Sequence, residues 1–169
     1  SCAKSNSSNT TISGAAFTYK YYTNNTCTTG ETTTAPTNQG TYYVKATLTA
    51  GTNYESSSSE CKTYTMSKKN ITVTAGSSSK KYNGSALTDS TCTAGSGQLI
   101  SGHTVTCTMT SGSTVTNVAD SPVTNTIDTV SIVNGTTDVK GNYNVTTQTG
   151  TLTFTKATCP APTNVAIAT

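Results

Sequence analysis

Apolar and polar side chains alternate over short stretches of this chain, and turn-forming residues separate the stretches. In the first stretch, at 15–23, Phe17, Tyr19 and Tyr21 share one side. A period of two residues is the period of a β-strand. The same alternation recurs at 40–50, 61–69, 69–75, 103–111, 125–135 and 150–157. No stretch has the periodicity of a helix, so the pattern predicts an all-β protein.

The alternation also predicts which side chains point inward. In the later strands these are Ile71 and Val73, then Val105, Cys107 and Met109, and finally Leu152 and Phe154. The stretch 125–135 leaves two registers open, one that buries Ile127 with Val133 and one that buries Val130 with Ile132. Asn83-Gly84, Asn134-Gly135 and Lys140-Gly141-Asn142 are typical of turns with positive φ.

The strand pattern predicts two tandem β-sandwich domains, and the two blocks end alike, each with a closing strand and then lysine. The first domain spans 1–67 and is either whole or shortened at its N-terminus. The second spans 68–157. Residues 158–169 are a linker or the start of a further module.

Seven of the nine tyrosines lie in the first block. By parity, we expect Tyr19, Tyr21, Tyr42 and Tyr64 to form its core, because the block has few other side chains to bury. Tyr22 and Tyr43 fall on the opposite face. These two residues are the alternative candidates for an exposed aromatic platform that binds a sugar.

Composition narrows the class of protein. Threonine supplies 42 of the 169 residues, and this β-branched residue favours strands. Arginine is absent and the net charge is +3, so we expect no binding to nucleic acid. No apolar run is long enough to cross a membrane, so we expect no membrane insertion by this segment. Ser1 opens directly into polar sequence without a signal peptide, and we therefore expect an excised part of a longer protein.

The six cysteines are widely spaced, which disfavours zinc and favours disulfides in an extracellular setting. Cys27 follows one strand of the first block and Cys61 opens its closing strand, so these two can form a bridge. Cys92 and Cys107 flank a loop of the second block and can form another. Cys2 and Cys159 lie at opposite ends, where each either pairs with a neighbouring module or remains a free thiol.

Several motifs resemble the repeats of large bacterial surface proteins. The first block, with YYTNNTC, GTYYVKATLTAGTNY and CKTYTMSKK, resembles their Ig-like repeats. The second, with KKYNGSALT, LISGHTVT, TNVADSPVTNTI and GNYNVTTQTGTLTFTKA, is similar to the mostly-bacterial Ig-like (MBG-type) repeat. His103 stands where that family usually has an acid, and six cysteines are not a general feature of it. The resemblance implies a repeat unit of an adhesin or stalk, and it implies no catalytic residues.

Candidate chemistry is sparse. His103 is the only imidazole, and no catalytic constellation can be built around it, so we expect no enzyme. The seven acids are dispersed, so we expect no metal or cofactor. A Lys–Asn or Thr–Gln cross-link would need a buried acid, and most acids lie in loop-like sequence.

We therefore expect a disulfide-stabilised spacer on the bacterial cell surface or in a secreted protein, projecting a binding domain and flanked by modules of the same parent chain. The alternative is an adhesin module that itself binds a glycan or a host surface protein.

Overall fold

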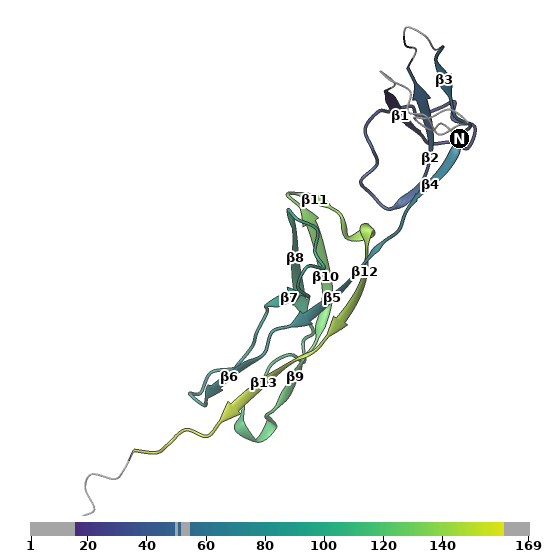
Figure 1. Ribbon diagram of the computed structural model, residues 1–169. Coiled ribbons are helices and arrows are strands. Elements are labelled where there is room, and N and C mark those ends of the chain that lie inside the picture. The colour runs from purple at the N-terminus through teal and green to yellow at the C-terminus, as the bar shows by residue number, and fades with distance from the viewer. Residues whose placement is uncertain (1–15, 50, 52–54, 161–169) are drawn as a thin grey trace, which may run out of the picture. The chain divides into compact units, whose positions relative to one another are not determined.

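The computed structural model describes residues 16–49, 51 and 55–160, and these residues are mostly β-structure. The chain divides into two compact units, Ser1–Lys68 and Lys69–Thr169. The division lies one residue beyond the boundary expected after Ser67. Figure 1 shows the strands of each unit.

Unit 1 contains one sheet built around a long central strand. Its strands are β1 (Phe17–Tyr22), β2 (Gly40–Leu48), β3 (Ser57–Ser58) and β4 (Lys62–Met66). β1 pairs antiparallel with one edge of β2, and β3 and β4 pair antiparallel with the other edge. Thr32 adds a single bridge to Tyr21 at the outer edge of β1.

The tyrosine side chains on the two faces of the unit 1 sheet are not buried as the sequence pattern predicts. Tyr22 is buried at 7% exposure, whereas Tyr19 is 53% and Tyr64 37% exposed. Tyr21, Tyr42 and Tyr43 are half-buried. The expected core of Tyr19, Tyr21, Tyr42 and Tyr64 is therefore wrong for Tyr19 and Tyr64. The reason is that the segment after β1 folds Cys27, which is buried, and Glu31, which contacts Tyr22, onto the face opposite to Tyr19.

Unit 2 contains three three-stranded sheets. The first, in the order β11-β10-β8, is formed by β8 (His103–Met109), β10 (Ile127–Asn134) and β11 (Thr137–Asp138). The second, β12-β5-β7, is formed by β5 (Lys69–Ala75), β7 (Cys92–Ala94) and β12 (Tyr143–Gln148). The third, β6-β13-β9, is formed by β6 (Ser78–Lys81), β9 (Val123–Asn125) and β13 (Gly150–Thr155). Two 3₁₀ turns, Val118–Asp120 and Lys140–Asn142, connect strands.

The core of unit 2 follows the sequence pattern. The main apolar cluster joins residues of the first two sheets, which pack against each other: Ile71, Val73, Ala75, Ile127, Val130, Ile132 and Tyr143. A second cluster lies by the third sheet: Leu87, Val115, Leu152 and Phe154. The core contains Val130 and Ile132, one of the two registers left open, and a register shift between Ile127 and Thr129 lets Ile127 join them, whereas Val133 is only half-buried. Gly84 and Gly135 have positive φ, as their predicted turns require. The prediction is wrong for Gly141, which lies in the 3₁₀ turn Lys140–Asn142 without a positive φ.

The buried side chain of Asn125 stabilises the region where the chain passes from the second sheet to the third. Its side-chain amide donates to the carbonyl oxygens of Gly76 at 2.8 Å and of Asp89 at 2.9 Å. Gly150 lies so close to Gly76 that a Cβ at this position would overlap the Gly76 backbone. Gly76 lies between β5 and β6, and Gly150 begins β13, which follows β12. The two segments can therefore approach this closely only because neither glycine has a side chain.

Candidate functional site

The first disulfide connects two places that lie far apart in the sequence of unit 1. Cys27 and Cys61 are joined across 34 residues, with Cα atoms 5.8 Å apart. Cys27 follows the end of β1, and Cys61 directly precedes β4. The bridge therefore links the first strand of the sheet to its last by a covalent route that leaves out β2 and β3.

The turn that presents Cys27 is built by the side chain of Asn24. Its carboxamide oxygen accepts hydrogen bonds from the backbone N–H groups of Thr28 at 3.0 Å and Thr29 at 3.1 Å. The Cys27 N–H donates to the Asn24 carbonyl at 3.1 Å. Cys27 has a φ of 52°, a left-handed conformation that is unfavourable for a residue with a Cβ. The asparagine and the disulfide together hold it there.

The second disulfide joins the two facing sheets of unit 2. Cys92 on β7 is bonded to Cys107 on β8, with Cα atoms 6.2 Å apart and a sequence separation of 15. Both cysteines pack against the main apolar cluster. The two bridges are the pairs expected from the sequence.

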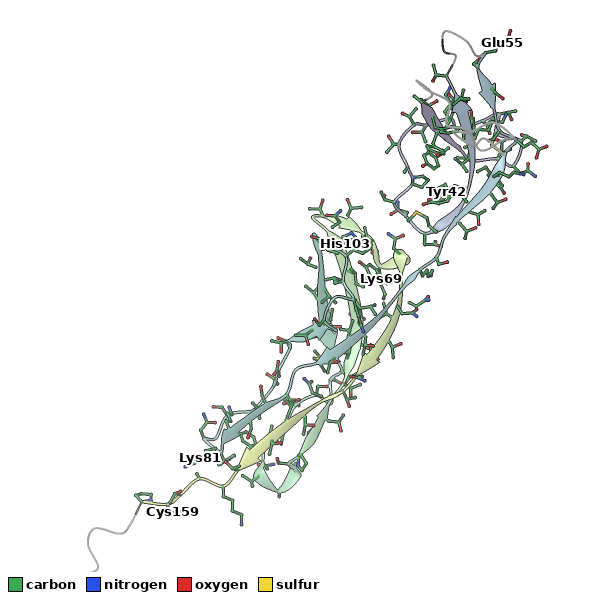
Figure 2. All side chains as sticks on the ribbon, viewed as in Figure 1. Tyr42, Glu55, Lys69, Lys81, His103 and Cys159 are labelled. Carbon is green, nitrogen blue, oxygen red and sulfur yellow. A yellow bond between two sulfur atoms is a disulfide. The ribbon has the colours of Figure 1, made fainter. Side chains whose placement is uncertain are left out.

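Of the two remaining cysteines, only Cys159 lies among the described residues. Cys159 is a free thiol and is exposed on the segment after β13 (Figure 2). Cys2 lies outside the described residues. An exposed thiol beyond the last strand can reach a partner outside unit 2, so the two alternatives stated for Cys159 stay open.

The first two strands of unit 2 lie beside its last two strands and run in the same direction (Figure 1). β5 pairs with β12 in parallel from Lys69 opposite Tyr143 to Thr74 opposite Gln148. β6 pairs with β13 in the same sense from Ser78 opposite Leu152 to Lys81 opposite Thr155. The strands at the start of the unit are thus hydrogen-bonded, over two consecutive ladders, to the strands at its end.

Side chains add hydrogen bonds across this parallel ladder. The Thr74 hydroxyl donates to the Gln148 carboxamide oxygen at 3.2 Å, and the Asn144 amide donates to Asn70 at 3.0 Å. The Thr74–Gln148 pair has the residue types of a Thr–Gln ester. Within the described part of the chain, however, no carboxylate hydrogen-bonds either side chain. The geometry accounts for a hydrogen bond and not for an ester.

Tyr22 and Tyr43 do not form an exposed platform. They pair on neighbouring strands, but Tyr22 is buried and Tyr43 half-buried. The Tyr22 hydroxyl donates to Glu31 Oε2 at 2.9 Å, and Lys20 Nζ lies 2.6 Å from Glu31 Oε1. The prediction that Tyr22 offers an open ring is wrong, because Glu31 and its loop cover that side of β1.

The Lys20–Tyr22–Glu31 cluster shifts the pKa of each member. The hydrogen bonds from Lys20 and then from Tyr22 hold the pKa of the Glu31 carboxyl below its ordinary value. The same bond to Glu31 raises the pKa of Lys20. Burial, followed by the bond to Glu31, raises the pKa of Tyr22. Sequence reasoning missed this cluster, since Glu31 lies in a loop-like stretch with no periodic signal.

His103 is a structural partner of a buried tyrosine. It is the first residue of β8, and its Nδ1 lies 2.7 Å from the Tyr143 hydroxyl. The Ile100 N–H already donates to that hydroxyl at 3.1 Å. Which of the two atoms donates this hydrogen bond depends on the tautomer of the His103 ring, because the hydroxyl oxygen has two lone pairs and can accept from both neighbours.

Among residues 16–49, 51 and 55–160, no group of three or more histidine, cysteine or acidic side chains is arranged to hold a metal ion. None of their helical segments has the length and apolar character needed to span a membrane.

Comparison of the chain with protein-family models, with curated proteins and with solved structures gives no match.

Proposed function

We propose that this chain is a structural spacer: two disulfide-locked Ig-like β-domains of an extracellular protein that hold a binding domain away from a bacterial surface. The role is mechanical and uses no catalytic residue or cofactor. Its partners are the neighbouring modules of the same parent chain. The resemblance of the sequence motifs to bacterial Ig-like repeats supports the assignment to a surface protein.

The parallel ladders β5–β12 and β6–β13 of unit 2 carry the proposal. Tension applied through the two ends of the unit enters at β5, the first strand, and leaves at β13, the last, so the strands of each ladder are pulled in opposite directions along their own axes. The hydrogen bonds between these strands then share the force and must break together. A ladder pulled from one end would instead open one bond at a time. The geometry of unit 2 therefore suits a domain that has to remain folded under tension.

The two disulfides support an extracellular location. Bridges of this kind persist in oxidising environments and are rare in the cytosol. Unit 1 has a single sheet, and Tyr22 and Cys27 are the buried apolar side chains among its described residues. A covalent bridge is of most use to such a thin-cored domain, because cross-linking destabilises its unfolded state.

Pulling the full chain in a single-molecule force experiment tests the proposal. Handles at the two ends load β5 and β12 in shear. In a control geometry, the second handle is inserted at the turn after β10, beside Gly135, so that the force passes through β5 and β10, which lie in different sheets. We expect unit 2 to unfold at a clearly higher force in the end-to-end geometry. Equal or lower resistance there would exclude a spacer that relies on this ladder.

A further inference from the structure

A pocket of about 330 Å³ opens on unit 1 beside the end of β1 and the loop that follows it. The rings of Tyr21 and Tyr42 line it from neighbouring strands, and the loop between β1 and β2 closes it with Ala35 and Pro36. Figure 2 shows Tyr42 on β2 within this unit. The volume is at the lower end of the range of about 300–1,000 Å³ typical of small-molecule sites.

The aromatic wall of the pocket is fixed by its neighbours. The Tyr42 hydroxyl donates to the Asn38 carbonyl at 3.2 Å, which ties the ring to the loop. Gly40 lies so close that a Cβ there would be 3.2 Å from the Tyr42 hydroxyl oxygen and 3.3 Å from its ring. On the other side, the Tyr21 ring is 6.0 Å from the ring of Tyr64. The wall is therefore in place before any ligand arrives.

The polar groups at the pocket are neutral and include free donors. The hydroxyls of Thr34 and Thr37 line it, and neither hydrogen-bonds another group of the described chain. No charged side chain is among the described residues that line it. The nearest acid along the loop, Glu31, is engaged by Lys20 and Tyr22.

We propose that this pocket binds one neutral pyranose ring of a glycan. The apolar C–H face of a sugar packs against an aromatic ring, while its hydroxyls need neutral donors and acceptors at the edge of the site. Tyr21 and Tyr42 supply the aromatic rings, and Thr34 and Thr37 supply the neutral donors and acceptors. A sugar acid would bring a carboxylate to a place without a cationic partner, which is unfavourable. The site shares Tyr22 with the platform expected from the sequence, but Tyr43 is not among the described residues that line it.

The proposal does not depend on the spacer function, and the two can fail separately. The test is a titration of the isotope-labelled full chain, followed by amide NMR, with methyl pyranosides of glucose, galactose and mannose and with methyl N-acetylglucosaminide. We expect at least one of them to shift the amide signals of residues 32–38 and Tyr42, with a dissociation constant of about 1 mM. Cyclohexanol, which has a similar ring and one hydroxyl, should bind at least 5-fold more weakly.

Two sets of variants distinguish the contribution of the Tyr42 ring to sugar binding from that of the Thr34 and Thr37 hydroxyls. Tyr42→Leu should weaken sugar binding about 5-fold, whereas Tyr42→Phe, which keeps the ring, should bind like the parent protein. The double variant Thr34→Val, Thr37→Val changes only exposed loop positions and should also weaken binding. Unchanged amide spectra outside the pocket verify folding for every variant. No shift with any of the four sugars, shifts on another surface, or equal binding of cyclohexanol would each overturn the proposal.

Discussion

Cys27 and Cys61 form a covalent shortcut between the first and the last strand of unit 1. Tension that enters at β1 passes through the sulfur atoms to β4, so residues 28–60 carry none of it while the bridge is intact. β2, the central strand of the sheet, lies inside this protected segment.

This shortcut predicts how far unit 1 extends under force. Breaking the bridge frees residues 28–60. With a sequence separation of 34 and about 3.3–3.6 Å per residue, the unit should lengthen by roughly 110 Å more than the oxidised form. The measurement compares the extension released by the full chain with that of the variant Cys27→Ser, Cys61→Ser. An equal extension for the two proteins would mean that the bridge does not lie in the path of the force.

The second disulfide predicts a loss of equilibrium stability in unit 2. Removing a bridge that closes a loop of 15 residues costs about 3 kcal/mol in the chain-entropy model. The variant Cys92→Ser, Cys107→Ser should therefore lower the free energy of unfolding of unit 2 by about this amount, measured by urea unfolding with NMR signals of each unit. Unit 1 signals, which report on a separate disulfide, should keep their midpoint. A loss below about 1 kcal/mol would contradict the prediction.

The crossing at Gly150 provides a matched pair of glycine variants. Gly150→Ala places a methyl group against the Gly76 backbone, which cannot move aside as a side-chain end can. We expect a loss of about 1–3 kcal/mol, the usual cost of overpacking. Gly141→Ala is the control, because a Cβ there meets nothing within 4 Å. Urea unfolding of both variants measures the difference, and similar stabilities would show that the crossing tolerates a side chain.

Alternation along the strands predicts the core of unit 2 well and that of unit 1 poorly. In unit 2, one side of each strand is clearly apolar, so Ile71, Val73, Leu152 and Phe154 could be assigned directly. In unit 1, Tyr21 and Tyr22 are adjacent and both faces of β1 carry a large ring. The buried face is decided by the loop that brings Glu31 to Tyr22, and strand periodicity holds no information about that loop.

Two other features could not come from alternation. The register shift after Ile127 adds one residue to a strand, so apolar positions on both parities reach the same side. The parallel pairing of β5 with β12 joins residues 74 apart in the chain, such as Thr74 and Gln148. Only Tyr143 and Val145 of β12 are apolar, and the rest of the strand is threonine, asparagine and glutamine, so its apolar pattern is too short to mark it as the partner. The cysteines were easier to assign, because their positions at strand ends limit which bridges can form.

The cluster at Glu31 predicts that acid destabilises unit 1. The folded-state pKa of Glu31 is lowered, so its contribution to stability is complete above the unfolded pKa of about 4.3 and is lost as the pH falls through the folded value. Thermal unfolding followed by unit 1 amide signals should show a falling midpoint below about pH 4. Glu31→Gln keeps the shape but cannot be ionised, so its midpoint should change less over this range. Asp89→Asn is the matched control, because Asp89 also has a lowered pKa, through hydrogen bonds from Thr91 and Ser78, but lies in unit 2. An unchanged acid response of unit 1 in Glu31→Gln would show that another group controls it.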